Sequence, residues 1–410
     1  MPKDPAVTVD GATSILAGHG DILGYSGDTV GTVNLQNGGT LYHDSTDAHI
    51  TVGAVVNMNK GYITAAPNAQ GSDSFGNYIF DNAINVTGGT DNEISVNRIT
   101  LRQYGSTPGN GGGKITVVKE ENEDTVLTIS SVIDGNYVPL VKQGAGELVL
   151  NAANTYTKGT TISEGTLTLA GAGTTGAGTV DIAADGTLNF YVTADETPMQ
   201  VDVTNATAIS GTGKFVKSGD GVLRINNENA DGSVKAESFT VNSGRLDYKG
   251  FFEGNIEIIN GAIFSPGNSV GTLNVTGDFA VTNGKTLFEF DSFGSNSYDV
   301  LNILGDDNSF TAGASMIELY FENEADAQAW ADSLEVNDGY RLVADDGFTA
   351  GNYSSWLDNY TTLFGLEGRS DGLYLIGAAS PDPGSGVPEP STWALLALGV
   401  AGLMYWRKSK

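Results

Sequence analysis

The sequence predicts an all-β fold built as a solenoid, in which short strands wind around one axis and each coil stacks on the next. Three observations support this prediction. Glycine accounts for 56 of 410 residues, about twice its usual share, while 40% of the residues are hydrophobic. Short alternating strands recur between Asn-Gly and Asp-Gly pairs. One segment of the chain also repeats itself.

The strands are recognised by their alternation. In Thr166-Leu167-Thr168-Leu169 every second residue is apolar, as a half-buried strand requires. Comparable strands are expected at 32–35, 48–52, 114–118, 179–182, 255–259, 272–275 and 286–290. Asparagine, aspartate and glycine tolerate positive φ, so tight corners are expected at 37–39, 185–186, 260–261 and 283–284.

The internal repeat aligns residues 141–170 with residues 216–249, with a short insertion in the second copy. Val141-Lys142 corresponds to Val216-Lys217. Gly144 and Gly146 correspond to Gly219 and Gly221, and residues 162–167 correspond to 241–246. A sandwich closes one core and rarely repeats its own sequence, so repetition favours a solenoid. We therefore expect a solenoid over residues 1–310, with the clearest repeats at 141–275.

Two stretches resemble known surface proteins. Residues 141–167 (VKQGAGELVLNAANTYTKGTTISEGTL) closely resemble the autotransporter-associated β-strand repeat. Residues 264–273 (FSPGNSVGTL) resemble a stretch common in autotransporter passengers. This resemblance implies a right-handed parallel β-helix on the cell surface.

Residues 311–380 change in character and predict a small α+β cap. Asn323 is expected to cap a short helix with Ala327, Trp330, Ala331 and Leu334 on one face. Strands are expected at 316–321, 340–344 and 372–376, and the aromatic residues after Asp346 predict a small core of their own. A cap is expected because an uncovered end coil exposes its strand edges. Residues 381–386 are a linker.

The last segment, residues 387–410, has three parts in a fixed order. They are Val387, Pro388, Glu389 and Pro390; an apolar run at 393–406 with Trp393 and Trp406 at its ends; and the basic residues Arg407, Lys408 and Lys410. As a single hydrophobic helix the run is about 21 Å long. It therefore spans a hydrocarbon core of about 30 Å only marginally. Aromatic ends and a basic stop are typical of a membrane segment.

This order of motif, span and basic end resembles the PEP-CTERM sorting signal. The resemblance implies recognition and cleavage near Pro388-Glu389-Pro390 by an exosortase, after transient anchoring in the membrane. A buried helix in a soluble domain would explain the apolar run, but neither the proline pair nor the basic cluster. No apolar stretch of the export-signal type follows Met1. Because an exported chain needs an export signal, we expect either a truncated gene start or a signal peptide that has been removed.

Composition excludes several classes of protein. The net charge of −29 repels phosphate backbones, so we expect no nucleic-acid partner. The chain has no cysteine, which rules out disulfide bonds and thiolate metal sites.

Catalytic motifs are weak. Residues 267–271 (GNSVG) fit the G-x-S-x-G pattern of a nucleophilic serine, but a strand is expected after Ser269 where that motif needs a helix. The only histidines, His19, His43 and His49, lie far upstream. Residues 109–116 are similar to a phosphate-binding loop, except that proline precedes them and Ile115 replaces its Ser/Thr. Arginines are sparse, and no Arg/Lys/Asp cluster of a lyase stands out. We therefore expect no enzyme.

Metal sites are equally weak. His43 and His49, with Asp44 and Asp47 between them, match no standard ligand spacing. Calcium remains a candidate at Asp291, Asp299, Asp306 and Asp307, although no Gly-Gly-x-Gly-x-Asp repeat accompanies them. We otherwise expect no cofactor.

The sequence as a whole predicts a non-catalytic, secreted or cell-surface protein of structural or adhesin-like type, processed by an exosortase-type system. An extracellular polysaccharide matrix is a candidate setting. One alternative is a β-helix surface protein that binds carbohydrate or cleaves it as a lyase does. Another is ice binding, which needs a regular threonine ladder. Such a ladder is suggested by Thr160, Thr161, Thr166 and Thr168, but the second repeat replaces these residues.

Overall fold

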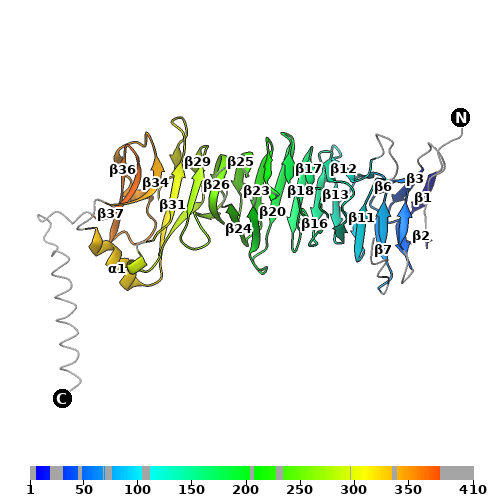
Figure 1. The fold of residues 1–410 in the computed structure, drawn as a ribbon, viewed down its shortest axis with the longest axis horizontal. Helices are drawn as coiled ribbons and strands as arrows, with labels where there is room; N and C mark the ends of the chain where they lie inside the picture. The colour runs from blue at the N-terminus through cyan, green and yellow to red at the C-terminus, as the bar shows by residue number, and fades with distance from the viewer. Residues whose placement is uncertain are drawn as a thin grey trace, which may run out of the picture.

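The computed structural model describes residues 6–18, 31–44, 49–67, 69, 76–103, 111–203, 207–227, 234–295, 297–334 and 339–378. These residues form an elongated rod, with the N-terminal coils at one end and the predicted cap at the other (Figure 1). Nearly all of the regular structure is β-strand, and the rod contains one α-helix. The all-β prediction is therefore confirmed for the described part of the chain.

The N-terminal half of the rod has three parallel sheets. Sheet A contains β1 (Ala6–Asp10), β3 (Thr32–Gln36), β6 (Val55–Asn59), β9 (Ile84–Thr87), β12 (Lys114–Val118), β15 (Leu140–Gln143), β17 (Thr160–Ile162), β19 (Val180–Ile182) and β22 (Ile209–Gly211). Sheet B begins with β2 (Ile15–Gly18), β4 (Thr40–His43), β7 (Tyr62–Ala65), β10 (Asn92–Ser95), β13 (Val126–Ile129), β16 (Glu147–Leu150), β18 (Gly165–Ala170) and β20 (Gly186–Tyr191). Sheet C contains β5 (Ile50–Val52), β8 (Tyr78–Phe80), β11 (Arg98–Leu101) and β14 (Val132–Asp134).

The C-terminal half has a different cross-section. Sheet B continues through β23 (Lys214–Ser218), β25 (Lys235–Val241), the second part of β26 (Arg245–Ile258), β29 (Phe279–Val281) and β32 (Phe310–Thr311). A further sheet, sheet D, contains β21 (Met199–Val203), β24 (Val222–Asn227), the first part of β26, β27 (Ile263–Ser265), β28 (Thr272–Val275), β30 (Lys285–Phe290), β31 (Val300–Ile303) and β33 (Ile317–Phe321). All of these pairs are parallel, as a solenoid requires.

The side chain of Asn154 joins neighbouring coils where sheet C has ended and sheet D has not yet begun. Its Oδ1 accepts a hydrogen bond from the Ile133 amide at 2.8 Å, and its Nδ2 donates to the Thr174 carbonyl at 2.7 Å. The amide therefore replaces part of the backbone pairing that a strand would supply, because buried backbone groups need partners. The turn that contains Asn154 in the first repeat therefore joins this coil to both of its neighbours.

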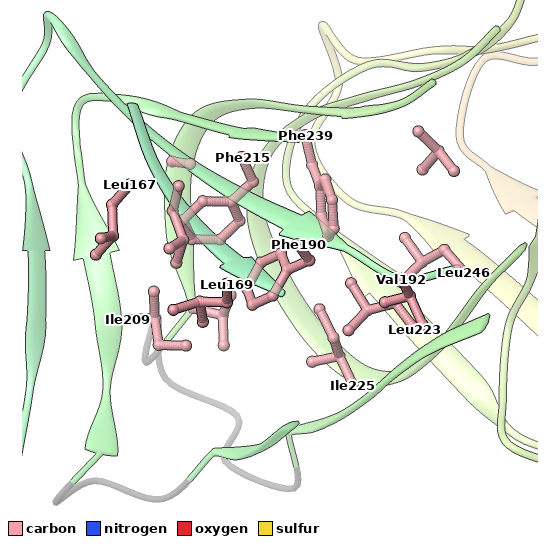
Figure 2. Packing of buried hydrophobic residues seen from close by; sticks show 14 of the residues in the cluster. Leu167, Leu169, Phe190, Val192, Ile209, Phe215, Leu223, Ile225, Phe239 and Leu246 are labelled. Carbon is pink, nitrogen blue, oxygen red and sulfur yellow. The ribbon is translucent and has the colours of Figure 1, made fainter. Parts of the chain in front are cut away.

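The core consists of columns of inward side chains, each stacked on its equivalent in the next coil. One column of sheet B reads Leu41, Ile63, Ile94, Ile129, Leu150, Leu169, Phe190, Lys217, Val241, Ile258 and Val281. Aromatic rings fill the middle of the rod, where Phe215 and Phe239 pack edge to face with centroids 5.5 Å apart (Figure 2). Each coil buries its apolar face only against its neighbours, which is the basis of solenoid stability.

The two sequence repeats build the same corner. Gly165 and Gly244 have φ values of +70° and +69°. A Cβ at either position would lie 2.4 Å from a carbonyl oxygen of the coil before, that of Gly144 or Gly221. Only glycine fits such a contact. The alignment made from the sequence is thus confirmed at the level of individual corner atoms.

A buried lysine completes each corner. Lys142 and Lys217 are both 0% exposed. The Lys142 ammonium donates to the carbonyls of Gln143, Gly144 and Glu164 at 3.1, 2.6 and 3.0 Å. Lys217 does the same with the carbonyls of Ser218, Gly219 and Ser243 at 2.9, 2.7 and 3.2 Å. The buried charges are therefore matched by three acceptors each, which offsets the cost of removing them from water.

The two corners nevertheless lie on different edges of the rod. Lys142 belongs to β15, so the first repeat turns from sheet A into sheet B. Lys217 belongs to β23, so the second repeat turns from sheet B into sheet D. The repeat therefore encodes a local corner and not a fixed place on the circumference of a coil.

The predicted cap helix is present as α1 (Glu324–Ser333). Asn323 caps it by accepting a hydrogen bond from the Asp326 amide at 3.0 Å, and Ala327 and Trp330 are buried. The expected separate core is wrong, because Trp330, Phe348 and Phe364 belong to the same continuous apolar cluster as the solenoid. The apolar side chains of this segment are therefore continuous with the core of the coils before it.

Strand pairing reverses at the end of the rod. β34 (Tyr340–Asp345) pairs in parallel with β31 and antiparallel with β37 (Gly372–Gly377). β36 (Phe364–Arg369) and β35 (Gly351–Asn352) follow in antiparallel order. Parallel pairing thus continues beyond residue 310, where the sequence predicts the cap to begin. The domain division and the right-handed winding stay predictions.

No helix in the described part of the chain is long and apolar enough to cross a membrane. The predicted linker at 381–386, the sorting segment at 387–410 and its hydrophobic helix at 393–406 lie outside the described residues.

Candidate functional site

A column of polar side chains runs along the outer face of sheet A. It consists of Thr8, Asn34, Asn57, Asn85, Thr116, Gln143 and, one coil further, Ser163. Asn85 Nδ2 donates to Asn57 Oδ1 at 3.0 Å, and Asn57 Nδ2 donates to Asn34 Oδ1 at 2.8 Å. These bonds link successive coils through their side chains. The strand pairing, which sequence alone does not reveal, is what aligns these residues.

An open groove lies where this column reaches the corner between sheets A and B. We call it the corner groove, and its volume is about 590 Å³. It is lined by Thr116, Val118, Lys119, Gln143, Gly144, Ala145, Ser163, Glu164 and Asp185. The groove is not recognisable in the sequence, because its residues come from coils of unequal length and no fixed spacing connects them.

The buried Lys142 lies directly beneath the corner groove. The carbonyls of Gln143, Gly144 and Glu164 bind its ammonium, and the same three residues line the groove. Burial lowers the pKa of Lys142 to about 8, while the carboxylates of Glu164 and Glu147 oppose this shift. The lysine therefore remains charged at neutral pH, and holds the groove floor in one conformation.

A second polar feature surrounds the loop at 265–271. Asp299 is buried, and its carboxylate accepts hydrogen bonds from the amides of Gly271 and Glu289 at 2.7 and 2.9 Å. It also accepts one from the Ser265 hydroxyl at 3.2 Å. Burial raises the pKa of Asp299 to about 8, against the lowering effect of the two amides. Asp299 thus fixes the loop to the neighbouring coil.

A cluster of charges lies beside this loop on sheet D. Arg245 contacts Asp247, and its Nη2 lies 2.6 Å from Glu289 Oε1. Arg224 Nε lies 3.4 Å from Asp247 Oδ2. Burial raises the pKa of Asp247, and Arg245 and Arg224 oppose that shift. The expectation that no such cluster stands out is therefore wrong. Strand pairing places Arg224 opposite Asp247, far from it in sequence.

The serine motif does not form a nucleophile elbow. Ser269 is exposed in a loop with φ +117°, and strand β28 follows it. His43 lies in β4 of the N-terminal coils, and His19 lies outside the described residues. Ser269 therefore lacks the strand-to-helix turn that the motif requires.

The histidine and aspartate residues considered as metal ligands lie in environments of other kinds. His43 is buried, with its Nδ1 3.1 Å from Asn77 Nδ2. Asp299 holds the loop described above, whereas Asp291, Asp306 and Asp307 are exposed. In the described residues, no group of three or more histidine and carboxylate side chains is arranged to hold a metal ion.

Two further features predicted from the sequence are the segment similar to a phosphate-binding loop and the threonine ladder. Of the glycine-rich segment 109–116, residues 109 and 110 lie outside the described residues, and Lys114 begins strand β12. In sheet A, Thr161 pairs with Val141 and Asp181. Thr160 and Thr168 are buried. Around Thr161, the described strands therefore carry no regular outward threonine ladder of the kind that ice binding needs.

The predicted sorting residues cannot be placed in this geometry. Val387, Pro388, Glu389, Pro390, Trp393, Trp406, Arg407, Lys408 and Lys410 all lie outside the described residues.

Comparison with known proteins bears on the repeat of the solenoid and on the C-terminal sorting segment. The family model of the passenger-associated-transport repeat matches residues 140–169. The family model of the PEP-CTERM protein-sorting motif matches residues 386–409. The chain is also 27% identical over 303 residues to the adhesin BmaC autotransporter of Brucella suis biovar 1 (strain 1330).

That alignment covers 67% of this chain and 7% of the Brucella protein, so the chain spans only a small part of its relative's length. The first family match coincides with the repeat whose corner contains Lys142 and Gly165. The second coincides with the tail identified from its three-part pattern. The chain thus carries a passenger-associated-transport repeat within an all-β rod of parallel sheets, ends in a PEP-CTERM protein-sorting motif, and is similar to an autotransporter adhesin.

Proposed function

We propose that this chain is a non-catalytic, adhesin-like protein of the cell surface, held in or near an extracellular polysaccharide. The observation that carries this proposal is the pairing of a sorting motif at 386–409 with a solenoid similar to an autotransporter adhesin. The first feature supports export, and the second supports a role in attachment. A parallel solenoid suits such a role, because stacked coils present a long repetitive surface.

Each segment has a part in this proposal. Residues 1–310 wind as a right-handed β-helix, residues 311–380 cap it, and residues 381–386 link it to the tail. An exosortase-type enzyme recognises residues 387–390 and cleaves there. Until then, residues 393–406 anchor the chain, and the basic residues after them stay on the cytoplasmic side.

The sorting step is tested by replacing Pro388 and Pro390 with alanine in the full chain, expressed in its own host. We expect the wild type to lose its C-terminal segment and leave the membrane fraction. The double variant is expected to remain there at full length. Pro383→Ala, a proline change in the linker, is the matched control. Identical processing of the wild type and the double variant would refute the role of the motif.

The adhesive role is tested in the same host by deleting the gene and restoring it. Attachment to polysaccharide-coated and bare surfaces is measured under flow. We expect deletion to reduce attachment and the full chain to restore it. Attachment that does not change upon deletion would contradict the proposal.

One observation favours a second function, that of a carbohydrate-active enzyme. Arg224, Arg245, Asp247 and Glu289 combine carboxylates with basic groups, as polysaccharide lyases require. In the structure, however, the two arginines pair with these carboxylates. Purified full chain incubated with uronic-acid polymers tests this function. Release of unsaturated products by the wild type, lost upon Glu289→Gln, would establish it and overturn the non-catalytic proposal.

A further inference from the structure

The corner groove crosses four successive coils. Thr116 belongs to β12 and Gln143 to β15, Ser163 and Glu164 follow β17, and Asp185 follows β19. These strands are consecutive neighbours in sheet A. With strands about 4.8 Å apart, the groove extends about 14 Å along the rod. A ligand that fills it therefore lies parallel to the long axis and meets side chains of successive coils.

The side chains that face the groove have unused hydrogen-bonding capacity. In the described part of the chain, Thr116, Gln143 and Ser163 make no side-chain hydrogen bond to other residues. This distinguishes them from the asparagines of the same column, which bond to one another. Two hydroxyls and a carboxamide provide donors and acceptors together. Hydroxyl groups of a sugar chain are complementary to such a set, because each also donates and accepts.

The charges around the groove restrict the ligand further. Lys119 lies 3.4 Å from Asp124 and is paired with it. The carboxylate of Glu164 interacts electrostatically with Lys142 below the floor. Asp185 adds a further carboxylate, and the chain as a whole carries −29. A polyanion is therefore repelled, whereas an uncharged ligand has no such penalty.

The groove floor is built in advance of any ligand. Gly144, which lines the groove, has a φ of +76°, and a Cβ there would lie 2.4 Å from the Val117 carbonyl oxygen. The ammonium of Lys142 fixes three carbonyls of the same floor. A rigid floor loses little entropy when a ligand binds, which favours affinity.

From these observations we propose that the corner groove binds an uncharged, extended polysaccharide whose chain runs along the rod. The rise per coil is similar to the length of one sugar residue in an extended chain. Successive sugars therefore meet Thr116, Gln143 and Ser163 in turn. This inference rests on the proposed attachment function and supplies its ligand class.

The test measures binding of hexasaccharides to the purified full-length chain by calorimetry. The uncharged probes are the β-1,4-linked hexamers of glucose, mannose and N-acetylglucosamine, and the anionic probe is hexagalacturonate. We expect saturable binding of at least one uncharged probe and much weaker binding of the anionic probe. Lack of saturable binding by all three uncharged probes, or tighter binding of hexagalacturonate, would overturn the proposal.

Two variants locate the site. The double variant Gln143→Ala, Ser163→Ala removes outward groups that make no internal hydrogen bond, so we expect the fold to persist, as circular dichroism can verify. Two lost hydrogen bonds predict an affinity about tenfold lower. Thr240→Ala, an outward change on sheet B, is the matched control and should bind as the wild type does. Equal affinity of the double variant and the wild type would exclude the corner groove.

The same variants separate this inference from the adhesive role. Glycan binding by a wild type that has no attachment phenotype would refute adhesion and leave the groove as a ligand site. Attachment that depends on the chain but survives the double variant would support adhesion and remove the groove from it.

Discussion

Replacement of Lys142 by methionine tests whether the buried ammonium stabilises the corner of the repeat. Methionine keeps most of the apolar stem in the column between Ile115 and Ile162, so the packed volume changes little. The change removes three hydrogen bonds from a charged donor, which are worth about 1.5–3 kcal/mol each. It also removes the cost of burying the charge, which is seen in the lowered pKa of about 8. The expected net loss is about 2–4 kcal/mol.

The assay combines urea unfolding, followed by circular dichroism, with hydrogen exchange in residues 141–170. Solenoids lose stability locally, so exchange of the Ser163 amide, which donates to the Lys142 carbonyl at 2.9 Å, should accelerate most. Lys158→Met, at an exposed lysine between β16 and β17, is the matched control. If Lys142→Met unfolds at the same urea concentration as the control, and exchange is unchanged, the corner role assigned to the lysine is refuted.

Three further predictions concern stability. Gly244→Ala places a Cβ 2.4 Å from the Gly221 carbonyl oxygen at a residue with positive φ. We therefore expect misfolding, or a decrease of at least about 3 kcal/mol in the free energy of unfolding measured with urea. A decrease below about 1 kcal/mol would contradict this. Burial raises the pKa of Asp299 from 3.8 to about 8, so its contribution to stability is complete below about pH 4 and is lost as pH rises through about 8. We therefore expect the melting temperature of the wild type to fall between about pH 4 and pH 8. Asp299→Asn should make this fall less steep, and an equal pH dependence in both proteins would contradict the role assigned to Asp299. Asn57→Ala removes two hydrogen bonds of the polar column on sheet A and should lower the free energy of unfolding by about 1–2 kcal/mol. Asn268→Ala, at an exposed loop residue, should have little effect, and equal effects of the two changes would refute a stabilising role of the column.

Much of the local structure follows from sequence patterns. The strand expected at 114–118 and the one at 272–275 have the predicted bounds. The expected capping of α1 by Asn323 is also present. These features depend on residues close together in the chain, through alternation, turn chemistry and side-chain caps. Sequence patterns reveal such features because the interacting groups are neighbours in the chain.

The residues of the candidate site could not be predicted from such patterns. Gln143 and Ser163 line one groove, and Arg224 faces Asp247, only because coils of different length are stacked in a particular register. The single signal was the alternation itself, which marks these residues as outward-facing. It does not state which outward residues of successive coils meet.

The sequence by itself determined that this protein is built of short strands with glycine corners, that its repeats share one corner, and that it ends in a sorting motif. The tertiary structure decided on which edge of the rod each corner lies, and which polar groups meet on its surface. The physical reason is the range of the interactions. A corner is set by a few adjacent dihedral angles and one lysine. The register between coils is set by columns of mainly apolar side chains, such as that from Leu41 to Val281, which form only when the whole rod has stacked.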